Sequence, residues 1–163
     1  VTPVLYRLQN VYGPGQSLIN PYTGIVSLFA RLAKQGKSIP VYEDGQIVRD
    51  FVFIDDVASA IVAGVLHSPA TSTPYDIGLG ERTTIMQVAQ AIAEHYGAPA
   101  PHVTGQFRDG DVRAAWADTA RARQALDWEP RIGVTEGINR LCDWIDAQEG
   151  AVAPTPTRTA TEV

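Results

Sequence analysis

The sequence predicts an α/β protein with one folded domain. Segments with the 3.6-residue apolar period of a helix alternate along the chain with short apolar runs typical of strands. With 163 residues, of which 45% are hydrophobic and 19% charged, the chain is long and apolar enough to bury one core. After Gly150 no apolar period remains, so we expect residues 1–149 to be folded and 150–163 to be a disordered tail.

The first predicted element is a strand over residues 3–10. The sequence Gly13-Pro14-Gly15 follows, and neither a strand nor a helix continues through it, so residues 11–21 are predicted to be a loop. Ligands of α/β proteins bind beyond the carboxyl ends of strands. We therefore expect a site at this strand end, formed by its polar and aromatic residues: Arg7, Gln9, Asn10 and Tyr12.

A helix and a hairpin are predicted next. Residues 22–35 have apolar positions at i, i+3, i+4 and i+7, and Gly36 ends the helix. These apolar positions are Ile25, Leu28, Phe29 and Leu32. Residues 39–42 and 46–54 have strand composition and are joined by an Asp-Gly turn, which is typical of a β-hairpin.

The second half of the chain is predicted to be mainly helical. Asp55 and Asp56 are placed to cap a helix that ends near His67, and Thr84 with Gln87 forms a capping box for another helix. The remaining predicted elements are strands at 75–77 and 102–107, and helices that end at Tyr96, cover 118–127 and begin at Thr135.

Four segments resemble, in order and spacing, the extended short-chain dehydrogenase/reductases, and the resemblance covers residues 1 to about 148. They are 7–16 (Arg-Leu-Gln-Asn-Val-Tyr-Gly-Pro-Gly-Gln), 48–58, 75–80, and 110–113 with 116–118. Within that family the chain resembles the NAD-dependent nucleotide-sugar epimerases and dehydratases. Asn20-Pro21-Tyr22-Thr23-Gly24 is similar to the subgroup of dTDP-L-rhamnose 4-epimerases, and the chain is also similar to UDP-glucose 4-epimerases.

The resemblance implies that this chain is the C-terminal, substrate-binding half of such an enzyme. About half of a family member precedes the equivalent point, including the Gly-rich NAD loop and the catalytic Tyr-x-x-x-Lys. The implied fold is a remnant Rossmann strand plus a small mixed α/β substrate domain. The remnant strand, residues 3–10, is expected to have few or no neighbouring strands.

No catalytic residue is expected in this chain. A reductase of this class needs a Lys four residues after its Tyr, so that both lie on one helix face and the Lys lowers the pKa of the phenol. None of the six tyrosines meets this test. The residues at i+4 are Asn10, Gln16, Val26, Gln46, Leu79 and Ala100. The chain alone is therefore expected to be inactive.

A second segment is similar to an NAD loop. Residues 78–83, Gly-Leu-Gly-Glu-Arg-Thr, lie between a predicted strand and a predicted helix, but Thr83 replaces the third glycine and no acidic ribose ligand closes a second strand. We interpret this segment as a structural turn and expect no NAD binding by the chain alone. In the full-length family, Gln9 lies near the nicotinamide, so the resemblance makes it the one cofactor contact here.

The resemblance implies that a few residues of this chain bind a nucleotide sugar. Arg49 and Arg108 match the two arginines that hold the diphosphate, and forked guanidinium donors suit phosphate oxygens. Asn10 matches an asparagine that holds the phosphate or the sugar. The alternative is that both arginines are surface charges and Asn10 is a turn residue. Further implied substrate contacts are Thr23, Gly24 and Ile25, the base-pocket strand Pro40, Val41 and Tyr42, and the loop residues Asp111 and Arg113.

Composition excludes several partners. The net charge of −5 argues against binding to nucleic acid or a membrane surface, and no apolar run approaches the roughly 20 residues of a membrane span. Three scattered histidines and one cysteine form no metal site, and a single cysteine fits a reducing cytoplasm. Two alternatives to an enzyme half remain: an interaction module that self-associates through apolar surface, and an inactive truncation.

Overall fold

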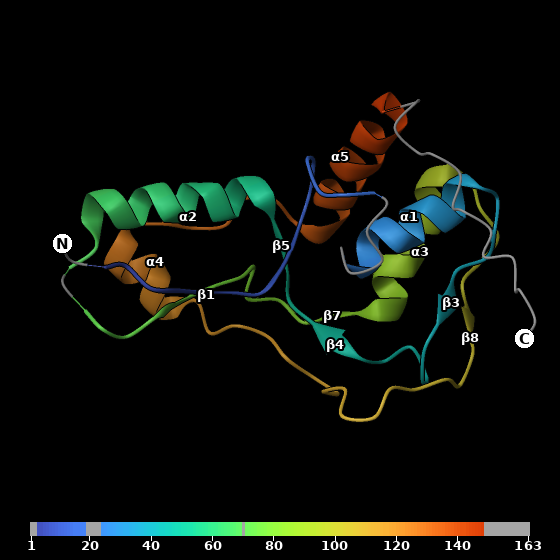
Figure 1. Cartoon of the computed structure of the whole chain (residues 1–163), viewed down its shortest axis with the longest axis horizontal. Coiled ribbons are helices and arrows are strands. Elements are labelled where there is room, and N and C mark those ends of the chain that lie inside the picture. Colours follow the sequence, from blue (N-terminus) through green and yellow to red (C-terminus); the bar gives the residue numbers. More distant parts are fainter. Residues whose placement is uncertain (1–2, 19–23, 70, 149–163) are drawn as a thin grey trace, which may run out of the picture.

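The computed structural model describes residues 3–18, 24–69 and 71–148, and the predicted tail at 150–163 lies outside them. Helices and short strands alternate, which confirms the α/β class (Figure 1). In chain order the elements are β1 (Tyr6–Leu8), β2 (Asn10–Tyr12), α1 (Ile25–Lys34), β3 (Pro40–Val41), β4 (Val48–Arg49), β5 (Phe51–Phe53), α2 (Ile54–His67), β6 (Tyr75–Ile77), β7 (Thr83–Thr84), α3 (Ile85–Tyr96), β8 (His102–Val103), α4 (Ala120–Leu126) and α5 (Val134–Ala147).

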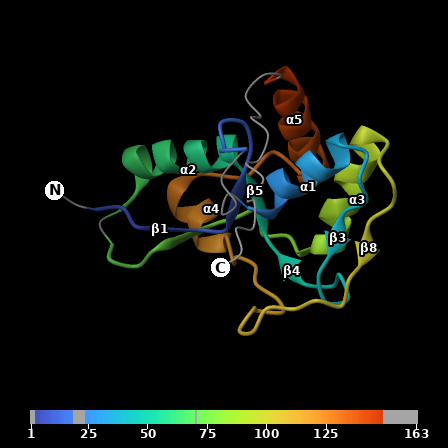
Figure 2. The ribbon, with the colours of Figure 1, turned by 45° about the vertical axis from the view of Figure 1, so that its right-hand side comes forward.

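The elements form two regions with separate cores. The open layer consists of β1, β6, α2 and α4, and the three-helix region consists of α1, α3 and α5. Strand β5 lies between the two groups of helices in both views (Figure 1, Figure 2). Phe51 and Phe53 belong to the core of the three-helix region, whereas Val52 belongs to the core of the open layer. Because side chains alternate along a strand, one buried strand serves both cores.

The predicted strand at 3–10 forms two strands with different partners. β1 pairs in parallel with β6, and β2 pairs in parallel with β5 and extends into the predicted loop. The change of partner occurs at Gln9, whose N–H donates to the Ile77 carbonyl at 2.9 Å, while the N–H of Asn10 donates to the Asp50 carbonyl at 3.0 Å. The expectation of few or no neighbouring strands is confirmed for the described residues: β1 and β2 have one partner strand each, and both partners come from later in this chain.

The predicted hairpin is wrong. Its turn does form, since the N–H of Gly45 donates to the Tyr42 carbonyl at 3.1 Å, and Glu43 and Gly45 have positive φ angles of 51° and 78°. The flanking strands nevertheless diverge: β3 pairs in parallel with β8, and β4 pairs antiparallel with β7. Val41 and Ile47 on either side of the turn are buried in the three-helix core, and this burial decides the strand directions.

The sequence predicts the N-terminal cap of α3 correctly, but it predicts the buried face of α1 only in part. The capping box of α3 is confirmed, with the N–H of Gln87 donating to Thr84 Oγ1 at 3.1 Å. In α1 the predicted apolar face is partly wrong, because Leu28 is 43% exposed. The buried residues of α1 are Val26, Ser27, Phe29, Ala30 and Ala33. The small alanine side chains on this face let α1 pack closely on α3.

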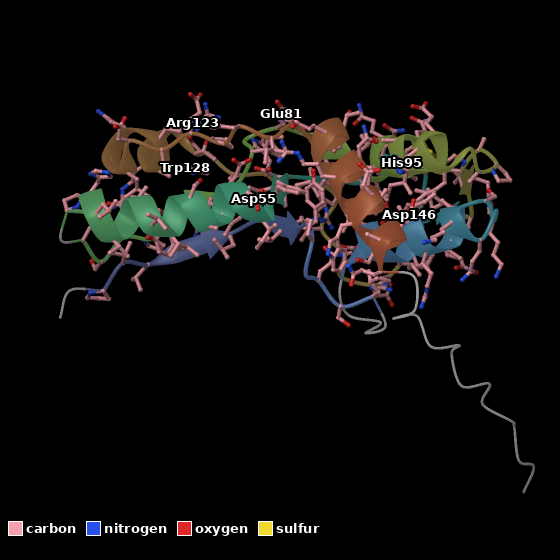
Figure 3. All side chains as sticks on the ribbon, turned by 90° about the horizontal axis from the view of Figure 1, so that it is seen from above. Asp55, Glu81, His95, Arg123, Trp128 and Asp146 are labelled. Atoms are coloured by element: carbon pink, nitrogen blue, oxygen red, sulfur yellow. The ribbon has the colours of Figure 1, made fainter. Side chains whose placement is uncertain are left out.

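Asp55 and Asp56 do not cap α2, contrary to the prediction. The helix begins at Ile54 without a side-chain cap. Asp56 is buried, and its carboxylate accepts the N–H groups of Arg131 and Ile132, each at 3.0 Å. Trp128 lies between α4 and α2 (Figure 3) and donates its indole N–H to the Asp56 carbonyl at 3.1 Å. Asp56 therefore fixes the segment between α4 and α5 rather than a helix end.

Candidate functional site

Arg49, at the end of β4, has a guanidinium held in one direction. Its side chain is only 16% exposed. Nη1 donates to the carbonyl of Val48 at 2.8 Å, and Nη2 donates to Asp111 Oδ1 at 2.6 Å. Two contacts therefore orient a charged group that has donors to spare, which is the arrangement that an oxyanion site requires.

The backbone that carries Arg49 is fixed by its neighbour Asp50. The Asp50 side chain is buried, at 1% exposure, and accepts three backbone N–H groups. Their donors are Leu79 at 2.8 Å, Gly80 at 3.0 Å and Ala117 at 3.1 Å. A buried carboxylate with three donors is well compensated, so it locks the junction of β4 and β5. Sequence reasoning missed this role, although Asp50 lies inside the recognised Arg-Asp-Phe motif.

An open depression of about 500 Å³ lies where the loop after β8 passes the end of β3. Tyr42, which is 38% exposed, and Phe107, which is 71% exposed, offer two aromatic faces there. Arg108 places its guanidinium carbon 5.8 Å from the centroid of the Tyr42 ring. The depression is lined by Tyr42, Thr104, Gly105, Gln106, Phe107 and Arg108. Exposed rings of this kind can stack on a planar base.

The lining residues 104–107 were not predicted. The predicted strand at 102–107 ends at Val103, and the chain continues as a loop. The Thr104 N–H donates to the Val41 carbonyl at 2.9 Å, and the Gln106 carbonyl accepts the Glu43 N–H at 2.7 Å. The only feature of the sequence that could have indicated this lining was Phe107, the aromatic residue beside Arg108. It indicated nothing without the loop path that brings residues 104–108 to β3.

The far end of this loop is held by ion pairs. Arg113 contacts Glu43 at 2.9 Å and Asp44 at 2.6 Å, so it serves the turn after β3 rather than a ligand. The Arg113 guanidinium holds the pKa of the Asp44 carboxyl well below its usual range. The N–H of Val48 also donates to the Arg113 carbonyl at 3.0 Å. Together these bonds bring the loop that contains Arg108 and Asp111 against Arg49.

The strand-end cluster predicted from the sequence is only partly assembled. Asn10 is exposed, and its backbone pairs with Phe51, two residues after Arg49. Gln9 is half-buried where β1 gives way to β2. Arg7 lies elsewhere and forms an ion pair with Asp76. Tyr12 is buried, and burial raises the pKa of its phenol. Asn10 and Gln9 therefore keep their candidate roles, whereas Arg7 and Tyr12 are structural.

The other predicted contacts are distributed unevenly. The side chain of Val41 lies fully within the three-helix core, and Pro40 beside it is half-buried. Gly24 precedes α1 with φ of 94°, and Ile25 packs against the three-helix core. Thr23 lies outside the described residues. Tyr42 is thus the residue of the predicted base-pocket strand whose side chain lines the depression.

The loop at 78–83 does not fit the pyrophosphate of NAD. Its amides at Leu79 and Gly80 are already bonded to the Asp50 carboxylate, and a carboxylate there would repel a phosphate. Among the described residues there is no group of His, Cys, Asp and Glu side chains suited to a metal ion. Within the same ranges, no helix combines the length and hydropathy of a membrane span.

Comparison with known proteins gives the family. Residues 1–78 match the NAD dependent epimerase/dehydratase family. A dTDP-L-rhamnose 4-epimerase of Burkholderia thailandensis is 56% identical over 149 residues, which are 91% of this chain and 41% of the relative. A UDP-glucose 4-epimerase of Mycolicibacterium smegmatis is 35% identical over 138 residues, 83% of this chain and 42% of the relative. The chain is thus related to the NAD-dependent epimerase/dehydratase family, as its motifs predicted.

Solved structures agree in fold. The UDP-glucose 4-epimerase of Thermotoga maritima with UDP-glucose is 29% identical, with a TM-score of 0.82, over 90% of this chain and 47% of that chain. The Thermus thermophilus UDP-glucose 4-epimerase complex with NAD is 32% identical, with a TM-score of 0.75, over 93% of this chain and 48% of that chain. The fold is therefore part of an extended short-chain dehydrogenase fold. The chain spans about two fifths of the length of the Burkholderia and Mycolicibacterium relatives.

Proposed function

We propose that this chain is the substrate-binding part of an NAD-dependent nucleotide-sugar 4-epimerase and holds the nucleoside diphosphate of the substrate. One observation carries the proposal. The loop at 104–113 lines the Tyr42–Phe107 depression with residues 104–108 and, three residues after Arg108, contacts the oriented guanidinium of Arg49 through Asp111. A diphosphate needs forked cationic donors, and a base needs an aromatic face. This one loop is in contact with both kinds of group.

In the intact enzyme, NAD⁺ would supply oxidation of the sugar C4 hydroxyl to a ketone and return of hydride to the opposite face. This chain's own contribution is binding and orientation. Arg49 and Arg108 would neutralise the two phosphates, Asn10 would donate its amide hydrogens to phosphate or sugar oxygens, and Gln9 would border the cofactor. No proton-transfer group of the chain is assigned, so we propose that the chain alone is inactive.

The substrate class proposed first is a dTDP-sugar, with UDP-sugars second. The 56% identical relative is named as a dTDP-L-rhamnose 4-epimerase, and several more distant relatives are named for UDP-sugars. Dehydration is the alternative reaction, since the family includes dehydratases. We also propose a reducing, cytoplasmic location, which fits the free thiol of Cys142. Cell fractionation tests the location.

The test is calorimetric titration of the chain with dTDP, UDP and NAD⁺. We expect a nucleoside diphosphate to bind and NAD⁺ not to bind. Arg49→Ala should weaken binding by roughly 1.5–3 kcal/mol, the scale of a lost hydrogen bond to a charged group. Arg131→Ala is the matched control, because that arginine is exposed and away from the depression. Equal affinity of Arg49→Ala and wild type would remove Arg49 from the site.

A second proposal rests on apolar surface in the open layer. Four apolar residues on the outer face of α2 are exposed: Ile61 (44%), Val62 (58%), Val65 (77%) and Leu66 (68%). β1 adds Leu8, at 44% exposure, and its outer edge pairs with no described strand. Such surface favours association. We propose that the isolated chain pairs with a second copy of itself through this face.

Light scattering after size exclusion tests this second proposal. The wild-type chain should elute as a dimer at micromolar concentration. Val62→Glu and Leu66→Glu place charges on the exposed face and should give monomers without loss of helical circular dichroism. Gln90→Glu, on the exposed side of α3, is the control. A monomeric wild type would refute self-association and leave the nucleotide-binding proposal untouched.

A further inference from the structure

In the structure, the guanidinium of Arg49 is paired with an anion that belongs to the chain itself. Asp111 Oδ1 lies 2.6 Å from Arg49 Nη2. A carboxylate presents the same charged oxygen acceptors to a guanidinium as a phosphate does. If Arg49 holds the substrate diphosphate, the diphosphate and Asp111 compete for the same donor. This competition has a structural consequence, because Asp111 belongs to the segment that also carries Arg108.

We infer that Asp111 is an internal substitute for the substrate phosphate and latches a strap, residues 107–112, over Arg49 until a nucleoside diphosphate displaces it. The inference rests on the proposed function and adds to it a gate and a basis for ligand selection. Asp111 then acts as a positioning residue: its effect on substrate passes through Arg49.

The strap is fixed at both ends and exposed in the middle. Before it, the Glu43 N–H donates to the Gln106 carbonyl at 2.7 Å; after it, the Val48 N–H donates to the Arg113 carbonyl at 3.0 Å. Every residue from 107 to 112 is exposed. Within the described ranges, the Arg49–Asp111 contact is the only ion pair that joins residues 107–112 to the rest of the molecule.

The position of the pair makes it exchangeable. The Arg49 side chain is 16% exposed, and that of Asp111 is 38% exposed. Asp111, on the strap, is therefore the more solvent-exposed partner of the pair. The cation stays behind, because Asp50 fixes its backbone. An exposed carboxylate leaves an ion pair at little free-energy cost. Release of Asp111 therefore exposes Arg49 while the same strap still holds Arg108 beside Tyr42.

The latch predicts which anions the site accepts. A monophosphate offers Arg49 about the same contact as the carboxylate it must displace. A diphosphate can bind Arg49 and Arg108 together, and so gains a second contact that Asp111 cannot supply. Asp111 should therefore weaken binding of every phosphate ligand that must displace it by the same factor. A diphosphate keeps useful affinity because of its second contact with Arg108, whereas a monophosphate lacks that contact.

Asp111→Asn tests the latch, with Asp109→Asn as the matched control. Both substitutions remove one negative charge from the strap, but Asp109 forms no ion pair with the described residues. Titrations use dTDP and dTMP. We expect Asp111→Asn to bind dTDP and dTMP each about 5- to 10-fold more tightly than wild type does, whereas Asp109→Asn changes either affinity less than about 2-fold. Ligand-free hydrogen exchange should speed up at 107–112 in Asp111→Asn alone.

Two results would overturn the latch while the proposed function stands: weaker dTDP binding by Asp111→Asn, which would mean that the carboxylate contacts the ligand itself, or equal effects of the two substitutions. In both cases wild type would still bind dTDP in an Arg49-dependent manner. If neither wild type nor Asp111→Asn bound dTDP or UDP, the proposed function would fail together with the latch. Binding by Asp111→Asn but not by wild type would support the latch in its strongest form.

Discussion

The three-helix region and the open layer each contain a tyrosine packed against a helical glycine, but the two tyrosines differ in burial. In each, a tyrosine hydroxyl lies against a helical glycine and donates to a carbonyl: Tyr12 with Gly137 of α5, and Tyr6 with Gly64 of α2. Tyr12 is 3% exposed, whereas Tyr6 is only half-buried. Among the described residues of α1, α3 and α5, Leu28 is the one exposed large apolar residue, while the open layer leaves an apolar face of α2 in water.

The difference shows which part of the chain can work without other surfaces. Of the predicted ligand groups, Tyr42 directly follows β3 and Arg49 ends β4. Val41, at the end of β3, and Ile47, just before β4, are buried in the three-helix core. The open layer contributes mainly through Asp50, which bonds to the loop after β6 and to Ala117 before α4. The candidate site thus depends on a closed core and on one buried carboxylate that joins the two regions.

Removing that carboxylate should have the largest effect. We expect Asp50→Ala to lower the free energy of unfolding by about 3–5 kcal/mol, because three buried N–H groups lose their acceptor. Urea unfolding followed by circular dichroism measures the change. Asp55→Ala, at an exposed carboxylate, is the control and should change stability by less than about 0.5 kcal/mol. A small loss for Asp50→Ala would mean that β5 alone couples the two regions.

A matched pair of glycine substitutions sharpens the comparison. A Cβ at Gly137 would lie 2.9 Å from Phe53 Cδ2 and would also clash with the Tyr12 hydroxyl. Tyr12 cannot move aside, because its ring centroid lies 6.2 Å from that of Phe51 and 5.6 Å from that of Phe53. We expect Gly137→Ala to destabilise by roughly 2–3 kcal/mol, the cost of overpacking a closed core. Thermal unfolding of the purified variant, read by calorimetry, gives the value.

Gly64→Ala is the counterpart in the open layer. Its Cβ would lie 2.8 Å from Tyr6 Cζ, but Tyr6 borders solvent and can swing away. The gain in helix propensity, about 1 kcal/mol, should then nearly offset the lost contact, so the net change is expected to be below about 1 kcal/mol. Equal losses at Gly64 and Gly137 would show that Tyr6 is as confined as Tyr12, and the contrast between the regions would disappear.

The smallest effect concerns pH and tests closure of the three-helix core. Cys142 has no exposed surface, and burial raises the pKa of its thiol from 9.0 to about 11. The protonated form is favoured in the folded state, so this stabilisation is complete below pH 9 and is lost as the pH rises towards 11. We expect wild type to lose about 1 kcal/mol more than Cys142→Ala between pH 8 and pH 10. Urea midpoints across that range decide it, and parallel pH profiles would contradict a closed core around the thiol.

Local patterns in the sequence were enough for several elements. The capping box at Thr84 and Gln87 forms as predicted because it depends on residues within one helical turn. The last helix, predicted to begin at Thr135, begins one residue earlier, at Val134. The motifs were likewise readable, and the family that they predicted agrees with the comparisons. Arg49 and Arg108 remain predicted ligand residues: Arg108 lines the depression, and Arg49 contacts Asp111 of the same loop.

The sequence by itself determined the α/β class, the family, and the residue types suited to a diphosphate, because these depend on composition and short-range spacing. Only the tertiary structure decided the partners. It pairs β3 with β8 instead of β4, buries Asp56 against Arg131 and Ile132, and sets Asp111 on Arg49. Each of these contacts joins residues more than 60 positions apart, a separation at which no local pattern shows which groups will meet.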